Sequence, residues 1–122
     1  MQGPFISVII PTYNSENFIA KTLETVSSQT YNKYEVIISD DGSTDNTVGV
    51  VKSFFVKYPF RNNELLINEH EGPGAARNKG IENARGDWVS FLDSDDIWNH
   101  NKLERVVRYI LYVCDLRCES NN

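Results

Sequence analysis

Four short apolar runs, separated by segments of helical periodicity, constrain the fold of this chain more than any other feature. The runs lie at residues 5–10, 34–39 and 64–68 and in the stretch VSFLDSDDIW that opens at residue 89. Their length and their polar or Pro boundaries are typical of strands buried on both faces. Parallel neighbours need a crossover connection, which a helix supplies. The alternation therefore predicts an α/β domain with a Rossmann-like, mainly parallel sheet flanked by helices.

The segments around these runs have the spacing of amphipathic helices. They cover residues 15–28, 48–59 and 74–84 and a last segment that contains Leu103, Val106, Val107 and Ile110. Polar side chains with an acceptor oxygen satisfy the free amides at a helix start, and glycine often follows a helix end. We expect Asn14 or Ser15 to cap the first helix, Ser43 or Thr44 to cap the second, and Gly86 to end the third.

Length and charge limit the classes of protein that the chain can represent. With 122 residues we expect residues 1–122 to form a single domain. The net charge of −5 disfavours non-specific binding to nucleic acid or to an anionic membrane. No run approaches the roughly 18 apolar residues of a membrane-spanning helix. Cys114 and Cys118 are expected to be free thiols in a reducing compartment, because a disulfide framework or a zinc site needs more ligands.

Polar motifs follow each apolar run at the point where the predicted strand ends. They are PTYN, DDGSTD, EGPGAAR and DSDD, in chain order. The carboxyl ends of parallel strands meet at one edge of a sheet, and ligands bind in the crevice outside that edge. The sequence therefore predicts one site built from all four motifs.

The motif DSDD places Asp93, Asp95 and Asp96 within four positions. Asp95 or Asp96 could cap the helix that follows, but three aspartates exceed that role. Carboxylates about 4 Å apart repel by roughly 4 kcal/mol at a surface-like dielectric unless a cation or proton intervenes. Magnesium and manganese prefer a few carboxylate oxygens together with substrate phosphate and water. Asp93-Ser94-Asp95 is therefore a candidate site for Mn²⁺ or Mg²⁺ shared with a phosphate.

The other motifs offer partners for a nucleotide, each with a plainer alternative. Asp40 and Asp41 either begin the turn to the second helix or accept a hydrogen bond from a nucleobase or a ribose hydroxyl. Arg77 either pairs with a phosphate or base carbonyl or is a solvated surface residue. GPGAAR is not a dinucleotide fingerprint, because Arg77 occupies the third glycine position. His70 and His100 are interpreted as surface residues.

The motifs SVIIPTYN, EVIISDDGSTDNT, GPGAARNKGI and GDWVSFLDSDD, in this order, resemble the nucleotide-binding half of the inverting family 2 glycosyltransferases. The resemblance runs from about residue 7 to residue 103. It implies an A-type glycosyltransferase fold, here truncated, a nucleotide-diphosphate sugar as donor, and Mn²⁺ or Mg²⁺ as cofactor.

The resemblance also implies roles for individual residues. Pro11, Thr12 and Tyr13 would line the base and ribose site, and Asp40 would hydrogen-bond the base. Arg77 would reach the base or the diphosphate, Asp93 would contact the ribose or the ion, and Asp95 would ligate the metal. Ser94 and Asp96 would be supporting positions.

The reaction that the resemblance implies is a single displacement at the anomeric carbon, with inversion. In the family the catalytic base and the acceptor elements follow the Asp-x-Asp at a distance, which here means beyond Asn122. We therefore expect the isolated chain to bind nucleotide weakly and to transfer sugar poorly or not at all.

The favoured donor is a UDP-sugar, and the acceptor a glycan, a lipid-linked group or a protein. The expected location is the cytoplasm or the cytoplasmic face of the membrane, and apolar surface left exposed by a truncated sheet would favour a homo-oligomer.

Two other hypotheses stay open. A phosphohydrolase with an aspartyl nucleophile at Asp93 also places paired aspartates at a strand end, although the downstream lysine and further acidic loop of such enzymes are not evident. A non-catalytic nucleotide-binding fragment is the second. A phosphoaspartate at Asp93 would favour the first, and metal-dependent nucleotide binding would favour the transferase.

Overall fold

Four parallel strands form the single sheet of the computed structural model, which describes residues 3–58 and 62–120 and side chains as far as residue 115. The strands are β1 (Ile6–Thr12), β2 (Tyr34–Asp40), β3 (Asn63–Ile67) and β4 (Trp88–Phe91), in the spatial order β3-β2-β1-β4. β1 therefore lies inside the sheet, with β2 on one side and β4 on the other. The predicted mainly parallel sheet is confirmed.

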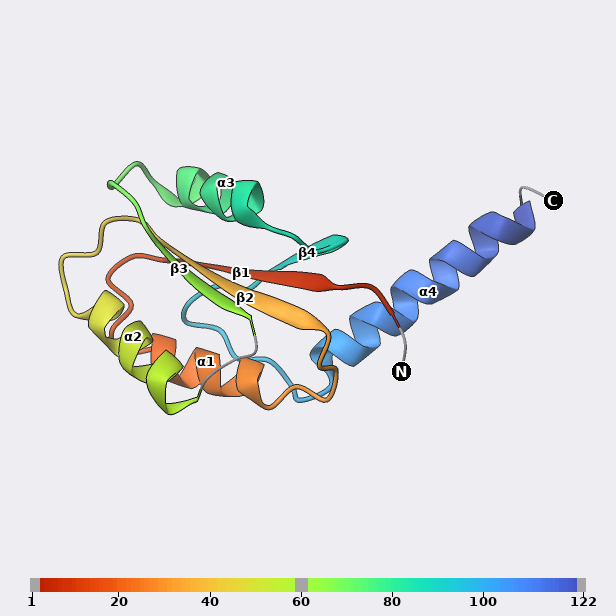
Figure 1. Cartoon of the computed structure of the whole chain (residues 1–122), viewed down its shortest axis with the longest axis horizontal. Coiled ribbons are helices and arrows are strands. Elements are labelled where there is room, and N and C mark those ends of the chain that lie inside the picture. Colours follow the sequence, from red (N-terminus) through yellow and green to blue (C-terminus); the bar gives the residue numbers. More distant parts are fainter. Residues whose placement is uncertain (1–2, 59–61, 121–122) are drawn as a thin grey trace.

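The described residues also form four helices: α1 (Ile19–Ser27), α2 (Thr47–Lys57), α3 (Pro73–Asn83) and α4 (Lys102–Ser120). α1 and α2 cover one face, α3 covers the other, and α4 extends away from the sheet (Figure 1). Pro59, the predicted end of the second helix, lies outside the described residues. No helix in the described ranges is both long and apolar enough to span a membrane.

The main hydrophobic core lies on the face that α1 and α2 cover. Ile6, Val8 and Ile10 alternate along β1 and are fully buried. They belong to one cluster with residues of β2, α1, α2 and the first half of α4: Val36, Ile38, Ile19, Leu23, Val26, Val51, Phe54, Leu103, Val107 and Ile110. The strand interior is apolar because β1 has a covered face on each side.

α3 lies very close to the opposite face of β1. A Cβ atom at Gly80 would lie 2.5 Å from Cγ2 of Ile9, which is closer than packed carbon atoms approach. Glycine at this position therefore sets how near α3 comes to the strand, and with it the position of the α3 N-terminus beside the strand ends.

The predicted cap of the first helix is wrong. α1 begins at Ile19, whose amide donates to the backbone carbonyl of Ser15 at 2.9 Å, and no side chain caps it. The side chain of Asn14 instead accepts from the amide of Thr44 at 2.8 Å, and the amide of Asn14 donates to Oγ of Ser43 at 2.9 Å. These polar groups join the loop after β1 to the loop after β2, which a local reading of the sequence does not reveal.

The predicted cap of the second helix is wrong as well. α2 begins at Thr47, whose amide donates to Oδ1 of Asp45 at 2.9 Å. Ser43 serves Asp40 instead, donating its amide to Oδ2 at 2.8 Å and its hydroxyl to Oδ1 at 2.7 Å. Within the segment DDGSTDNT, Ser43 thus hydrogen-bonds to the end of β2, and Asp45 hydrogen-bonds to the start of α2.

Exposed apolar side chains gather on the edge strand β4. Trp88, Val89 and Phe91 are between 37% and 48% exposed, because β4 has a strand neighbour on one side only. The exposed apolar surface expected from the sequence is therefore present, and self-association through it stays a prediction.

A buried carboxylate ties the strands together at the end opposite the polar loops. Glu35 on β2 is 1% exposed and accepts the Ser7 hydroxyl at 2.5 Å and the Arg85 amide at 2.7 Å. The Arg85 guanidinium lies 3.2 Å from the other carboxylate oxygen. Burial by itself raises the pKa of Glu35, but the hydrogen bonds from Ser7 and Arg85 and the charge of Arg85 outweigh it and hold the pKa below its usual value.

The Glu35 network predicts a pH-dependent contribution to stability. A carboxyl group with a lowered folded-state pKa stabilises the fold above its unfolded pKa, and the effect disappears as pH falls through the folded-state pKa. We expect Glu35→Gln to lower the free energy of unfolding at pH 7 by about 1–3 kcal/mol, with a smaller difference from the wild type in acid. Urea unfolding at several pH values measures this, with Glu24→Gln on the exposed face of α1 as control. Equal stability of wild type and Glu35→Gln at pH 7 would contradict it.

Candidate functional site

A cleft of about 440 Å³ lies at the carboxyl edge of the sheet. Residues from the ends of the strands and from α3 line it: Pro11, Thr12, Tyr13, Asn14, Ser15, Phe18, Asp41, His70, Pro73, Ala76, Arg77, Asp93, Ser94 and Asp95. The chain places β2 and β3 on one side of β1 and β4 on the other, so the strand order reverses beside β1. A crevice at such a switch point is where open α/β sheets bind ligands.

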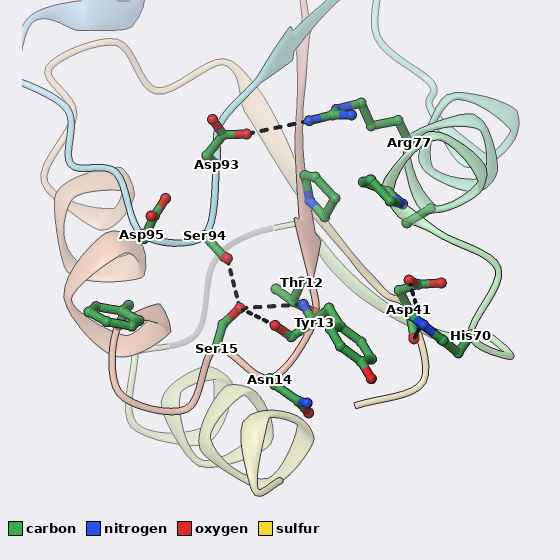
Figure 2. A pocket seen from close by; sticks show the side chains of 14 residues that line it. Thr12, Tyr13, Asn14, Ser15, Asp41, His70, Arg77, Asp93, Ser94 and Asp95 are labelled. Carbon is green, nitrogen blue, oxygen red and sulfur yellow. Dashed lines mark hydrogen bonds and ion pairs between the residues drawn. The ribbon is translucent and has the colours of Figure 1, made fainter. Parts of the chain in front are cut away.

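One end of the cleft lies beside the loops that follow β2 and β3. It consists of Tyr13, His70 and Asp41, and we call it the aromatic end (Figure 2). The rings of Tyr13 and His70 stack with centroids 4.3 Å apart and an interplanar angle of 20°. Nδ1 of His70 lies 2.9 Å from Oδ2 of Asp41. The ring pair and the carboxylate thus form one connected unit.

Asp41 is a rigidly held, ionised acceptor. Its side chain is almost fully buried, and its oxygens accept the amides of Glu71 at 2.8 Å and of Gly72 at 3.1 Å. Burial by itself raises the pKa of Asp41. The hydrogen bonds from these amides and from His70, with the charge of His70, outweigh burial and hold the pKa below its usual value. Both partners of His70 Nδ1, the carboxylate and the backbone carbonyl of Asp41, are acceptors. Nδ1 therefore carries the hydrogen, and Nε2 is left for other contacts.

The opposite end of the cleft, which we call the acidic end, carries Asp93, Ser94 and Asp95 from the loop after β4 (Figure 2). An amino group of Arg77 from α3 lies 3.6 Å from Oδ1 of Asp93. The two side chains are 40% and 60% exposed, and exposed ion pairs contribute little to stability. An incoming phosphate can therefore replace Asp93 beside Arg77, and a cation can replace Arg77 beside Asp93, at little cost in stability.

The donor set at the acidic end fits a divalent cation only in part. Asp93 and Asp95 line the same cleft. However, the described residues contain no cluster of three or more His, Cys, Asp or Glu side chains that could hold a metal ion. Mg²⁺ commonly uses one or two carboxylates and takes its other ligands from water and substrate phosphates. Two carboxylates in an open cleft match that mode of binding, in which the ion depends on the ligand.

Most of the residues predicted from the sequence meet in the cleft, and Asp40 does not. Pro11, Thr12, Tyr13, Arg77, Asp93, Ser94 and Asp95 all line it. Asp40 is 1% exposed, and its oxygens accept Oγ1 of Thr12 at 2.6 Å together with the two groups of Ser43. The structure therefore uses Asp40 to join the ends of β1 and β2, and brings the next carboxylate, Asp41, to the cleft wall.

Asp95 and Asp96 do not cap α4, because that helix begins only at Lys102. The amide of Asp96 instead donates to the carbonyl of Asp93 at 3.0 Å in a turn of the acidic loop, residues 92–101. Asp96 lies outside the cleft lining. The capping alternative for this cluster is therefore removed.

Sequence reasoning missed His70 and Ser15 as site residues. His70 is exposed, as expected, but its ring stacks on Tyr13 and binds Asp41. The sequence suggests only a helix-capping role for Ser15, whereas its hydroxyl lies 2.7 Å from that of Ser94 across the cleft. The position of His70 just after a predicted strand was the available signal for it. No comparable signal existed for Ser15, because its partner is 79 residues away.

The parallel α/β sheet with a cleft at its switch point has the fold of the A-type glycosyltransferase class, to which solved structures similar to this chain belong. Residues 7–115 match the model of glycosyl transferase family 2, which is most of the chain. The chain belongs to this family. The family resemblance predicted from the motifs is thereby confirmed.

Curated relatives are consistent with the family. The chain is 39% identical over 108 residues to a putative teichuronic acid biosynthesis glycosyltransferase, TuaG, of Bacillus subtilis, covering 88% of this chain and 42% of the relative. It is 38% identical over 112 residues to the Escherichia coli UDP-Glc:alpha-D-GlcNAc-diphosphoundecaprenol beta-1,3-glucosyltransferase WfgD, covering 91% of this chain and 43% of that enzyme. The chain thus spans less than half the length of these relatives.

Solved structures agree on the fold. S. aureus TarS 1–349 in complex with UDP superimposes with a TM-score of 0.78 at 37% identity, covering 87% of this chain and 32% of that one. The mannosyltransferase PcManGT from Pyrobaculum calidifontis, in complex with GDP-Man and Mn²⁺, gives a TM-score of 0.77 at 32% identity, covering 80% of this chain and 29% of that one. Both structures share the fold of this chain at more than 30% sequence identity.

The two neighbouring aspartates should differ in what their loss does to the fold. We expect Asp40→Asn to lower the free energy of unfolding by about 1–3 kcal/mol, because the new amide nitrogen cannot accept from Thr12 or Ser43. Asp95→Asn, at an exposed position, should stay within about 0.5 kcal/mol of the wild type. Urea unfolding monitored by circular dichroism compares them. Equal stability of the two variants would show that Asp40 does not join the strand ends as described.

Proposed function

We propose that this chain is the donor-binding part of a metal-dependent glycosyltransferase that moves a sugar from a nucleotide-diphosphate sugar to an acceptor hydroxyl with inversion. One observation carries the proposal: a single cleft holds a stacked aromatic pair with a buried carboxylate at one end and an Arg77–Asp93–Asp95 set at the other. A nucleoside diphosphate has the same polarity, with a flat base at one end and a dianionic phosphate at the other.

The aromatic end suits the nucleobase. The Tyr13 ring has one face on His70 and is 43% exposed, which leaves aromatic surface on which a base can stack. An ionised carboxylate accepts about four hydrogen bonds, and Asp41 receives three protein donors, of which the Gly72 amide is shared between both oxygens at 3.1 Å. In the proposal, a further donor such as the imide N–H of uracil takes the place of one of the two shared Gly72 contacts. In this proposal Asp41 takes the base-binding role that the sequence had suggested for Asp40.

The acidic end suits the diphosphate and its cation. Asp95, with Asp93, would hold Mn²⁺ or Mg²⁺ together with phosphate oxygens, and Arg77 would pair with a phosphate after leaving Asp93. Such an ion supplies Lewis-acid stabilisation of the departing nucleoside diphosphate. The mannosyltransferase with GDP-Man and Mn²⁺ supports a cation of this kind. TarS complexes with UDP and with UDP-GlcNAc support a UDP-sugar as donor.

The reaction proposed is a direct displacement. The acceptor oxygen bonds to the anomeric carbon as the bond to the donor phosphate breaks, the bonding electrons leave with the diphosphate, and a carboxylate base takes the acceptor proton. One displacement inverts the anomeric centre. The base is not assigned to a residue of this chain. The E. coli relative, named for a lipid-diphosphate-linked acceptor, supports an acceptor of that class.

Nucleotide and metal binding test the proposal directly. Calorimetric titration of the chain with UDP, GDP and dTDP, each with and without Mn²⁺, should show metal-enhanced binding of UDP. We expect Asp95→Ala to weaken Mn²⁺–UDP binding by about 10- to 100-fold and to leave metal-free UDP binding unchanged, because only the ion contact is lost. No binding of any nucleotide at millimolar concentration would overturn the proposal.

Asp41→Asn provides the complementary variant for the aromatic end. The amide cannot replace the ionised acceptor, so UDP binding should weaken by about 10-fold with and without Mn²⁺.

Incubation of the wild type with phosphoryl donors tests the hydrolase alternative, because a phosphoaspartate at Asp93 would favour that enzyme. A third outcome is metal-dependent nucleotide binding without any transferase activity. That outcome would favour a module that only binds nucleotide.

A further inference from the structure

α1 presents a line of polar side chains to the acidic loop. Thr22, Thr25 and Gln29 are spaced three and four residues apart, which places them on one side of the helix and its C-terminal extension. Each of the three hydrogen-bonds to the backbone of residues 94–103. This line lies outside the cleft lining.

Thr22 makes the contacts nearest to the predicted metal ligands. Its hydroxyl oxygen lies 2.8 Å from the carbonyl oxygen of Ser94 and 2.6 Å from that of Asp96. A hydroxyl has one hydrogen, so it donates to one of these carbonyls at a time or is shared between them. The two carbonyls flank Asp95 in the chain. Thr22 therefore fixes the backbone on both sides of the carboxylate proposed to hold the cation.

The remaining contacts hold the rest of the loop. The amide of Trp98 donates to Oγ1 of Thr25 at 3.2 Å. The side-chain amide of Gln29 donates to the carbonyl of Asn99 at 2.7 Å and accepts from the amide of Leu103 at 2.9 Å. Side chains of α1 and of its C-terminal extension thus satisfy several backbone groups of the loop.

The burial of Thr22 indicates that its hydroxyl is there for this contact. The residue is 1% exposed and lies beside Leu23 and Val26 of the core. A valine would fill the same space without a polar atom, and a buried hydroxyl is costly unless it is hydrogen-bonded. The polar group is therefore explained by the two carbonyls and not by packing.

We propose that Thr22 is a positioning residue that orders the acidic loop so that Asp93 and Asp95 face the cleft. The neighbouring carboxylates repel each other, and the Thr22 contacts hold the backbone between them against that repulsion. With these contacts, the carboxylates are already in place when the cation and the diphosphate arrive. The metal-binding part of this inference rests on the function proposed above.

Isosteric substitution tests the inference in the whole chain. Thr22→Val removes the hydroxyl and keeps the shape, Thr22→Ser keeps the hydroxyl, and Ser27→Ala removes an α1 hydroxyl that bonds only within its own helix. Two readouts are needed: hydrogen exchange at the amides of residues 93–98, and Mn²⁺ affinity in the presence of UDP, measured from free Mn²⁺ by electron paramagnetic resonance.

We expect Thr22→Val to speed exchange in this segment and to weaken Mn²⁺ binding by about 10-fold, as loss of a partner that orients a metal ligand does. UDP binding without metal should not change, and Thr22→Ser and Ser27→Ala should behave as the wild type. If Thr22→Val does not fold, Thr25→Val, which removes the acceptor of the Trp98 amide, should show the same direction of change.

Unchanged exchange and unchanged Mn²⁺ affinity in the folded valine variant would overturn the inference. An equal loss of metal-free UDP binding would also overturn it, because it would indicate general damage to the cleft. Failure of the wild type to bind Mn²⁺–UDP would instead overturn the proposed function, and hydrogen exchange would still decide whether Thr22 orders the loop.

Discussion

The parallel pairing of β1 with β2 on one side and β4 on the other is the constraint on which the rest of the structure depends. Thr12 at the end of β1 is in register with Asp40 at the end of β2, and the chain leaves β4 through Leu92, whose amide bonds to Ile9 of β1. Because all strands run in the same direction, every loop that carries a polar motif leaves the sheet at one edge. The cleft exists because β1 separates two groups of loops there.

The two ends of the cleft are held by different physical means. At the aromatic end, Asp41 is buried and receives backbone amides and the His70 ring, so its orientation is fixed by hydrogen bonds made directly to the carboxylate. At the acidic end, Asp93 and Asp95 are exposed, and α1 holds the backbone that carries them. For the proposed function, a rigid acceptor suits a neutral base that donates a hydrogen bond in a fixed direction. Exposed carboxylates suit a cation that arrives with its phosphate and must keep part of its water.

Much of the fold could be predicted because its signals are local. The apolar runs at residues 5–10 and 34–39 correspond to β1 and β2 within two residues at each end, since a strand buried on both faces has to be apolar along its length. Some cleft residues, among them Tyr13, Asp93 and Asp95, were predictable because their motifs follow predicted strands. The N-caps were not. Asn14 and Ser43 have the right side chains for capping, but each finds a partner in the other loop, about 30 residues away.

The sequence by itself determined the order of elements and the edge at which the polar motifs gather, because these follow from the alternation of apolar and polar segments along the chain. The family was indicated by the resemblance of four ordered motifs. Only the tertiary structure turned Asp40 toward Thr12 and Asp41 toward the cleft, brought His70 onto Tyr13, and placed Thr22 of α1 against the loop that carries Asp95. Adjacent aspartates are equivalent in a linear reading. They become different when the pleat of β2 and the turn that follows it direct one side chain toward Thr12 and the other toward the cleft.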